Sequence, residues 1–404
     1  MTKISKINIR KIIDSRGNPT IEVEIFDDRN LFGRAAAPSG ASKGSFEVKD
    51  YPEGGIDIGI SNFKSNVLNR LLGIELASQE KFDNTLHEID GSENFANIGG
   101  NITIATSLAY AKASALSESK ELYEFINKNN SKLKLPSPLG NIIGGGKHAI
   151  NGTTMQEFLS VSSGKNYTSS AFANIGVHKK VSELLKIKFP TLSLGLGDEK
   201  AWVAPLTDME ALEILSSAIN TIKEKSGVDI RIAVDLAASE FFKNGKYIYK
   251  NKELTTDEQI NFVAELAEKF NIKILEDPLH EGDFEGFAKL TQKIGSKTLI
   301  VGDDLFVTNK KRLEDGIQKG SANAILIKPN QIGTLTDMVD TVKLAKKSNY
   351  QTVISHRSGE TEDTTIAQLA VGLDIGYIKT GTIGGERTAK HNELIRIEEK
   401  INKK

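Results

Sequence analysis

The feature that most constrains this chain is a repeated pattern of short apolar runs and longer amphipathic segments from residue 138 to residue 404. Each apolar run has the length of a buried β-strand, and the segments between them have the apolar spacing of helices that cover a sheet. About eight such runs occur in a stretch close to the roughly 250 residues of a typical (β/α)8 barrel. The strand candidates are residues 138–145, 155–163, 230–239, 272–279, 298–305, 324–331, 351–358 and 376–381. The pattern therefore predicts an α/β fold with a TIM-like barrel.

A doubly wound open sheet is the alternative fold for such a pattern. That fold normally carries a glycine fingerprint after its first strand, and the chain has no GxGxxG motif. The run Gly144-Gly145-Gly146-Lys147 is not followed by serine or threonine, so it is a weak match to a phosphate-binding loop. The barrel is the preferred prediction.

The region before the barrel predicts a smaller α+β domain over residues 1–130. Alternating apolar residues indicate three strands near its start, and the pattern becomes helical from Asp57 to Lys128. Residues 38–45 are small, polar and glycine-rich, and we expect them to form a mobile loop, although a plain connector fits this composition equally well. Residues 131–137 are the predicted linker to the barrel domain, residues 138–404.

Composition narrows the function classes. The formal net charge of −1 gives no support for bulk binding to nucleic acid or to an anionic membrane, so an anionic substrate must be held by locally placed cations. The absence of cysteine excludes thiol catalysis and disulfides but leaves metals held by oxygen. No apolar run is long enough to span a membrane, and the N-terminal residues do not resemble a signal peptide, so we expect a cytoplasmic protein.

Most of the predicted barrel strands end in an ionisable residue, and catalytic groups in such barrels lie at these ends. Three of them are acids, Asp235, Glu276 and Asp303. Acids brought to one rim repel one another unless a cation lies between them, and a set of carboxylates suits Mg²⁺. The three are therefore predicted metal ligands, although each one alone would more often be a helix cap or a surface charge. Asp277 and Asp304 are predicted to be structural, because adjacent strand residues point in opposite directions.

The remaining rim residues are cations. Lys328 follows a run of apolar, β-favouring residues, and burial is expected to lower its pKa toward that of a general base, the alternative being a lysine that merely reaches solvent. Arg357 and Lys379 imply an anionic substrate, with Arg357 suited to a bidentate grip on phosphate or carboxylate. A base beside metal-bound oxygens suggests proton abstraction next to a carboxylate. Glu199, on a glycine-containing loop, is the candidate acid, and an exposed loop carboxylate is its alternative.

Several motifs together resemble the enolase family of phosphopyruvate hydratases, over nearly the whole chain. The matching stretches are residues 14–20, 38–42, 156–157, 276–278, 303–305, 330–334 and 355–363. The resemblance implies reversible dehydration of 2-phospho-D-glycerate to phosphoenolpyruvate in glycolysis and gluconeogenesis. It also implies two Mg²⁺ per active site, since a lysine or histidine base used with Mg²⁺ is the known pattern of this superfamily.

The resemblance also implies roles for individual residues. Lys328 would accept the proton from carbon 2, and Glu199 would protonate the departing carbon-3 hydroxyl. The three rim acids would hold the first metal ion, and Ser42 would help to hold the second together with the substrate phosphate. The residues implied to bind substrate are His148, Gln156, Glu157, His356, Arg357, Ser358 and Lys379.

Gln156 and Glu157 lie at the beginning of their predicted strand, whereas the other functional residues end theirs. They reach the same rim only if this strand runs in the opposite direction. The sequence thus predicts the irregular ββαα start that the family barrel has.

The chain departs from the family pattern at three places. Lys200-Ala201-Trp202 follow Glu199 where glycines are usual, which puts the motion of that loop in question. Pro329 follows Lys328 and cannot donate a backbone hydrogen bond. Residues 382–387 replace a pattern richer in arginine and proline. With its shorter length, the chain is more similar to archaeal than to bacterial members.

Family members are homodimers or octamers, and the resemblance implies a contact between Glu22 and Arg396 of the partner subunit. Two other functions stay open on the sequence alone. One is a Mg²⁺-dependent acid-sugar dehydratase or racemase of the same superfamily, and the other is a non-enzymatic structural or surface-binding role.

Overall fold

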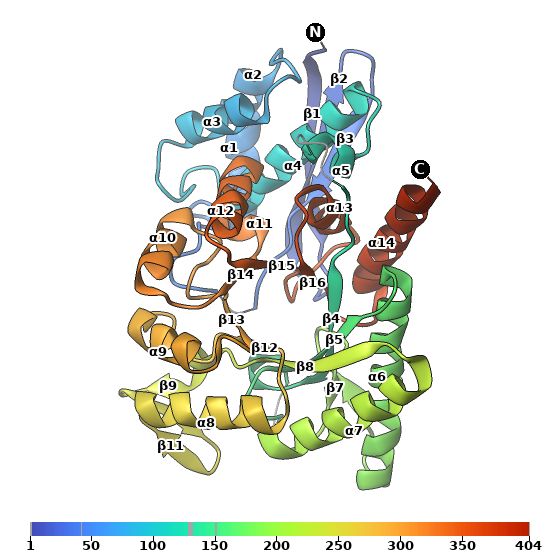
Figure 1. Ribbon diagram of the computed structural model, residues 1–404. Helices are drawn as coiled ribbons and strands as arrows, with labels where there is room; N and C mark the ends of the chain where they lie inside the picture. Colours follow the sequence, from blue (N-terminus) through green and yellow to red (C-terminus); the bar gives the residue numbers. More distant parts are fainter. Residues whose placement is uncertain (1, 42, 128–131, 150–151, 404) are drawn as a thin grey trace.

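The computed structural model describes residues 2–41, 43–127, 132–149 and 152–403, which form a small sheet-and-helix unit beside a closed barrel (Figure 1). Ser42, the predicted ligand of a second metal ion, lies outside the described residues. The first barrel strand begins at Ser137, which the sequence had assigned to the linker. The domain boundaries themselves stay a prediction.

The N-terminal unit is an antiparallel three-strand meander covered by helices, as its period-two and helical patterns predict. Helix α4 is buried along most of its length and packs on β2 and β3. Gly33 in β3 allows this contact, because a Cβ there would lie 2.2 Å from the carbonyl oxygen of Ala109. The elements are β1 (Ile4–Ile13), β2 (Pro19–Asp27), β3 (Phe32–Ala36), α1 (Gly55–Asn62), the π-helical turn η1 (Phe63–Val67), α2 (Leu68–Leu71), α3 (Gln79–Asp90), α4 (Gly100–Ser117) and α5 (Leu122–Ile126).

Within the described residues, eight strands close into a barrel, because β16 pairs with β4 at the end of the sheet. In barrel order they are β4 (Ser137–Gly144), β5 (Glu157–Ser163), β8 (Asp229–Asp235), β12 (Ile274–Glu276), β13 (Leu299–Gly302), β14 (Ala324–Ile327), β15 (Gln351–Ser355) and β16 (Tyr377–Lys379). Strand β5 is antiparallel to both of its neighbours, and the remaining pairs in the barrel are parallel. The predicted barrel and its irregular start are confirmed.

Alternation along the strands decides which side chains enter the barrel. In β14, Ala324 and Leu326 belong to a small cluster inside the barrel, whereas Ile325 and Ile327 belong to the large core shared with the helices. Lys328 lies two residues after Leu326, at the carboxyl end of the strand, and its side chain therefore also points to the inside of the barrel. Ala233 in β8 and Val301 in β13 also belong to the inner cluster, so Asp235 and Asp303, two residues further on, have the same phase.

The helices outside the barrel start where the sequence provides caps. Thr207 and Thr255 each form a capping box with the glutamate three residues later, at the starts of α7 and α8. These helices are α6 (Tyr167–Lys188), α7 (Asp208–Ser226), α8 (Thr256–Lys269), α9 (Phe284–Ile294), α10 (Lys310–Lys319), α11 (Pro329–Ile332), α12 (Leu335–Lys347), α13 (Thr365–Gly372) and α14 (Gly385–Lys403), with 3₁₀ turns at Gly146–His148 and Ala238–Phe241.

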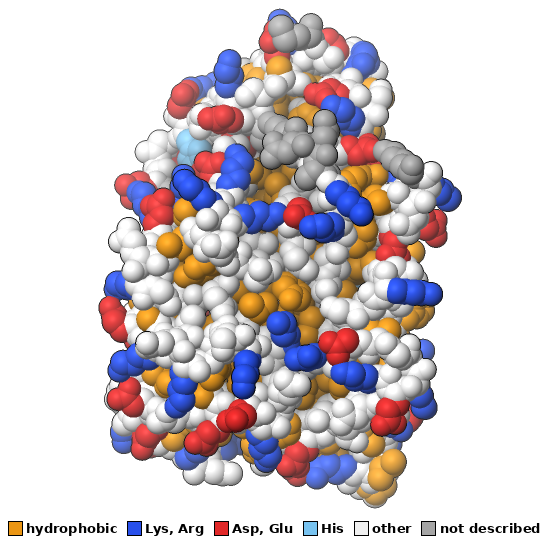
Figure 2. All heavy atoms as spheres, in the orientation of Figure 1, with side chains coloured by type: hydrophobic (Ala, Val, Ile, Leu, Met, Phe, Trp, Pro, Cys, Tyr) orange, Lys and Arg blue, Asp and Glu red, His pale blue; other side chains and the backbone are white. Residues whose placement is uncertain are grey.

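One small hairpin and one small three-stranded sheet were not predicted from the sequence. Strands β6 (Gly195–Leu196) and β7 (Trp202–Val203) carry the Glu199 loop, and β9 (Phe242–Lys243), β10 (Lys246–Tyr249) and β11 (Lys252–Leu254) form a separate sheet. Basic and acidic side chains are interspersed over the face shown in Figure 2, in keeping with a formal net charge of −1. Among the described residues, no helix has the length and apolar character needed to cross a membrane.

Candidate active site

The predicted strand-end residues meet at one mouth of the barrel. A hollow there is lined by residues at or near the ends of several barrel strands, together with Gly40 and Ala41 of the N-terminal unit. Its lining residues are Gly40, Ala41, His148, Gln156, Glu157, Glu199, Asp235, Asp303, Lys328, Ser355, His356, Arg357, Ser358 and Lys379. Glu276 lies next to it, in contact with Lys379. The structure therefore brings together every predicted site residue that it describes.

Lys328 is held at the junction between β14 and α11. Its backbone N–H donates to the Thr308 hydroxyl at 2.9 Å, and Pro329 occupies the first position of α11, where a missing N–H is tolerated. The Lys328 ammonium forms an ion pair with Asp303. Burial alone would lower the pKa of Lys328, but the Asp303 charge opposes it and the net pKa is raised. The predicted lowering of this pKa is therefore wrong, because the sequence did not show the contact with Asp303.

Lys379 is surrounded by carboxylates. Its Nζ lies 3.0 Å from Asp235 Oδ2, 2.8 Å from Glu276 Oε2 and 3.1 Å from Glu157 Oε2, and the whole side chain is buried. Although burial disfavours its charge, these carboxylates raise the pKa of Lys379 well above the usual lysine value. Burial and the charge of Asp235 raise the pKa of Glu276. One lysine thus occupies a place where several acids converge.

The acids form two compact groups among the described residues. The potential ligand atoms of His148, Glu157 and Glu199 lie within 4.8 Å of one another, and so do those of Asp277, Asp303 and Asp304. Neither group contains the complete predicted set of Asp235, Glu276 and Asp303. The set is divided because Asp235 and Glu276 form ion pairs with Lys379, whereas Asp303 forms one with Lys328.

Asp277 has a clear structural contact. Its carboxylate accepts the backbone N–H groups of Asp303 at 2.9 Å and Asp304 at 2.7 Å, and so fixes the turn that follows β13. The residue adopts a positive φ of 40°, which aspartate tolerates better than most residues. These contacts agree with the structural role predicted for Asp277.

Glu199 lies at the tip of the β6–β7 hairpin and is buried. Asn141 Nδ2 donates to its Oε2 at 3.1 Å, His356 Nε2 lies 3.4 Å from the same oxygen, and His148 Nδ1 lies 3.9 Å from Oε1. Burial disfavours the charge of Glu199, but the neighbouring imidazole of His356 and, behind it, the positive charge of Arg387 lower the pKa of this acid. Burial and the charge of Glu199 raise the pKa of Glu157. The pKa values of the two acids are thus shifted in opposite directions, and the shift favours the ionised form of Glu199.

The loop that carries Glu199 is fastened to helix α6. The Trp202 indole donates to the carbonyl oxygen of His178 at 2.9 Å, and the His178 Nε2 lies 2.9 Å from the carbonyl oxygen of Lys200. Lys200 has a positive φ of 61° at a position where the sequence comparison anticipated glycine. Two residues of the unusual Lys200-Ala201-Trp202 stretch thus hold the loop against helix α6.

Arg357 follows β15 and binds the carboxylate of Glu47, a residue that was not predicted to lie in the site. Its Nη1 and Nη2 lie 3.0 and 3.1 Å from the two oxygens of Glu47, and Nη1 also donates to Asn330 Oδ1 at 3.0 Å. Ser358 Oγ accepts the backbone N–H of Ala41 at 2.7 Å. The segment after β15 is therefore bonded directly to the N-terminal unit.

Three residues in or beside the site were missed. Gln331 Nε2 donates to Asp303 Oδ1 at 3.0 Å, and its place three residues after Lys328 was a usable signal. Arg387 contacts the 356–358 segment from α14, and it lay in a stretch noted only as unusual. Nothing in the sequence marked Glu47 as a site residue, because an acid near a glycine-rich loop is common on protein surfaces.

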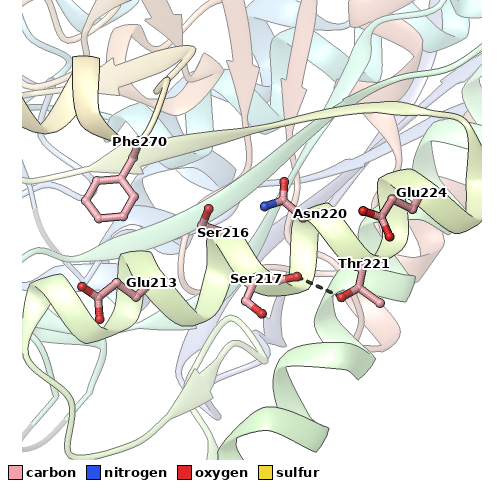
Figure 3. A pocket seen from close by; sticks show the side chains of 7 residues that line it. All are labelled: Glu213, Ser216, Ser217, Asn220, Thr221, Glu224 and Phe270. Carbon is pink, nitrogen blue, oxygen red and sulfur yellow. Dashed lines mark hydrogen bonds between the residues drawn. The ribbon is translucent and has the colours of Figure 1, made fainter.

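A second hollow lies on the outer side of α7 and offers no comparable chemistry (Figure 3). Its side chains come from successive turns of α7 together with Phe270, and the Thr221 hydroxyl donates to the Ser217 carbonyl of its own helix at 3.0 Å. The barrel mouth is thus the better candidate for catalysis.

The predicted interface residues have partners within the chain. Glu22 is paired with Arg10 in the same sheet, and Arg396 donates to Glu393 on its own helix at 2.6 Å. Whether Glu22 and Arg396 also meet across subunits stays a prediction.

The chain matches two family models, described as "Enolase, N-terminal domain" over residues 4–126 and "Enolase, C-terminal TIM barrel domain" over residues 132–404. An enolase of Methanothermobacter thermautotrophicus is 50% identical, with 98% of this chain and 97% of the relative covered. An enolase of Methanocorpusculum labreanum is 48% identical over 99% of this chain and 100% of the relative, and one of Picrophilus torridus is 47% identical over 99% of each. These relatives are archaeal, as the sequence comparison predicted.

Proposed function

This chain belongs to the enolase family and is a hydro-lyase acting on 2-phospho-D-glycerate, and we propose that Lys328 and Glu199 move the two protons of its reaction. Lys328 would take the proton from carbon 2, and Glu199 would give a proton to the leaving carbon-3 hydroxyl. The observation that carries this assignment is that both side chains, from segments far apart in the sequence, line the same buried hollow. Phosphoenolpyruvate and water are the products.

Lys328 needs its neutral form to accept a proton. In the structure it is paired with Asp303, so this ion pair has to open before the proton on carbon 2 can be taken. Burial then favours neutral lysine, and the nearby charges of Arg357 and Lys379 also lower its pKa, against the opposing charge of Glu276. Lys328 can therefore act as a base only after its ion pair with Asp303 has opened.

The lowered pKa of Glu199 favours its ionised form, which is the form that accepts a proton in the hydration direction. In the dehydration direction it must be protonated first. A bound substrate adds the negative charges of a phosphate and a carboxylate to the same hollow, and negative charge nearby raises the pKa of an acid. We therefore expect substrate binding to favour the protonated form of Glu199.

Substrate binding would use the cations already in place. The bidentate contact of Arg357 with Glu47 has the geometry of an arginine bound to phosphate, and Ser358 is adjacent. Lys379 would bind the substrate carboxylate. The hollow has a cavity volume of about 30 Å³, so we expect substrate binding to open some of its internal ion pairs. His148, Gln156, Glu157 and His356 would supply the remaining contacts.

The family is Mg²⁺-dependent, and the residues of this chain fit such an ion. The ammonium group of Lys379 lies among buried carboxylates, which shows that this place favours a positive charge. We assign Asp235, Glu276 and Asp303 to a first ion, and Ser42 with the substrate phosphate to a second. When bound, Mg²⁺ supplies positive charge that stabilises the negative charge developing on the substrate carboxylate.

The decisive test is a Mg²⁺-dependent turnover assay on 2-phospho-D-glycerate beside a panel of unphosphorylated acid sugars. We expect turnover with the phosphorylated acid only, because Arg357 and Ser358 are arranged for a phosphate. Turnover of an acid sugar with none of 2-phospho-D-glycerate would instead assign the site to another reaction of the superfamily.

We further propose a homodimer, or an octamer built from dimers, in which Glu22 faces Arg396 of the partner subunit. Reversing the charge at Arg396 is expected to lower the mass measured in solution, and an unchanged mass would reject this contact. A cytoplasmic location is proposed with it, since the substrate belongs to central carbon metabolism.

A further inference from the structure

Arg387 is fully buried in the first turn of α14, and it contacts three successive residues of the segment that follows β15. Its Nη1 lies 2.7 Å from His356 Nδ1 and 2.7 Å from the Arg357 carbonyl oxygen, and its Nη2 donates to the Ser358 carbonyl oxygen at 2.9 Å. A buried arginine is usually paired closely with an acid. Here the Glu386 carboxylate is 3.5 Å from Nε, and the shorter contacts go to the active-site segment.

The contact with His356 determines where the imidazole proton lies. A guanidinium group only donates hydrogen bonds, so the ring nitrogen that faces it must accept. Nδ1 of His356 is therefore unprotonated, and a neutral ring carries its hydrogen on Nε2. That nitrogen lies 3.4 Å from Glu199 Oε2. The Nε2–H group of His356 thus lies beside the proposed proton donor of the reaction, although Nε2 makes no hydrogen bond within the described residues.

The charge state of His356 agrees with this geometry. Burial and the positive charge of Arg387 lower the pKa of His356 to about 4, against the opposing charges of Glu199 and Glu360. The ring is therefore neutral near pH 7, and it offers a single N–H group whose position depends on Arg387.

We propose that Arg387 is a positioning residue that fixes His356 as its Nε2–H tautomer and so keeps the ring N–H group next to Glu199. This inference rests on the proposed roles of Glu199 and His356. The same side chain holds the carbonyl groups of Arg357 and Ser358, so it sets the orientation of the whole 356–358 segment. Arg387 itself does not line the hollow and is not a catalytic residue.

The test uses nitrogen NMR of the full-length protein labelled at its six histidines, because protonated and unprotonated ring nitrogens differ in chemical shift. The signals of His356 are assigned by their loss in His356→Gln. In the native protein we expect His356 to be protonated at Nε2 only. Protonation at Nδ1 would overturn the inference, and this result needs no variant of Arg387 to fold.

Variants then test the link to activity. Arg387→Met should allow His356 to adopt either tautomer and should lower kcat about 10- to 100-fold, the range known for the loss of a group that orients a metal-binding histidine. Arg387→Lys keeps a charged donor and should recover part of the loss. Lys390→Met is the matched control, since Lys390 is also buried on α14 but contacts residues 360 and 361: its ammonium lies 2.8 Å from Glu360 Oε2 and donates to the Thr361 carbonyl oxygen at 2.9 Å. It should lower the melting temperature without changing the His356 tautomer.

The outcomes separate the inference from the function on which it rests. An unchanged tautomer in Arg387→Met, at any level of activity, would overturn the role of Arg387. If the native protein shows the expected tautomer but His356→Gln keeps full activity, the proposed role of His356 would be overturned instead. Loss of both the tautomer and kcat in Arg387→Met, with neither lost in Lys390→Met, would support the inference.

Discussion

Replacing Lys328 by methionine tests the proposed base directly. The substitution keeps an unbranched apolar side chain in a buried position but removes the group that accepts the proton. Loss of a positioned proton-transfer group lowers the rate about 10²- to 10⁴-fold, which corresponds to about 3–5 kcal/mol in the activation free energy. We therefore expect Lys328→Met to lose nearly all turnover of 2-phospho-D-glycerate.

The same substitution also affects stability, because Asp303 loses its ammonium partner. Removing one partner of a buried ion pair lowers the free energy of unfolding by about 3–5 kcal/mol when the remaining charge is left alone. Asp303 keeps the hydrogen bond from Gln331, so we expect a loss below this range. Thermal unfolding of the variant will show whether the protein remains folded at the assay temperature.

The informative measurement is exchange of the carbon-2 proton with deuterated water, because it reports proton abstraction without requiring loss of the hydroxyl group. Exchange should disappear in Lys328→Met. The matched control is Lys112→Met, which removes a lysine paired with Asp363 at 3.0 Å outside the hollow. That variant should lose stability but keep exchange. Exchange retained in folded Lys328→Met would refute the assignment of Lys328 as the base.

Four further outcomes are expected. The hydrogen bond from Arg10 lowers the pKa of Glu24 to about 2, so this carboxylate stabilises the fold above pH 4.5 and loses that contribution as the pH falls toward 2. Melting temperatures of Glu24→Gln should accordingly depend less on pH in this window, and an unchanged dependence would contradict the shift. Pro329→Ala should change the free energy of unfolding by less than about 1 kcal/mol and leave kcat intact, because proline at the first helical position replaces no needed N–H group; a large loss of kcat would show that the proline positions Lys328. Asp277→Ala should lower the free energy of unfolding by about 1–3 kcal/mol for each backbone N–H group left unpaired, and Asp277→Asn should lower it less, as measured by urea unfolding. Removal of Mg²⁺ by a chelator should abolish turnover and lower the melting temperature, since an ion present at 100 times its Kd stabilises the fold by about 2.7 kcal/mol; a melting temperature insensitive to Mg²⁺ would argue against the proposed ligands.

Much of the barrel mouth could be predicted because it follows from local alternation. Once β14 is recognised as a strand, the inward phase of Leu326 determines that of Lys328, and the same reasoning applies to Asp235 and Asp303. The reversed direction of β5 could be predicted for the same reason, from the place of Glu157 at the beginning of its strand.

What the sequence did not show depends on contacts between distant segments. The expected fall in the pKa of Lys328 considered burial alone, and the structure adds the opposing charge of Asp303 from the neighbouring strand. The small β9–β11 sheet was missed because its strands are only two to four residues long. Glu47 could not be assigned, since its partner Arg357 is about three hundred residues later in the chain.

The contacts around the 356–358 segment imply that the N-terminal unit is part of the active site. Glu47 holds Arg357 from one side, and the backbones of Ser39 and Gly359 exchange two hydrogen bonds of 2.7 and 2.8 Å. Gly359 permits this approach, because a Cβ there would lie 2.4 Å from Asp14 Oδ2 and 2.6 Å from Ser39 Oγ. Arg387 holds the same segment from the C-terminal helix. The proposed phosphate-binding residues therefore take their orientation from both ends of the chain, so a barrel separated from its N-terminal unit would lose contacts that position Arg357 even if every barrel strand remained intact.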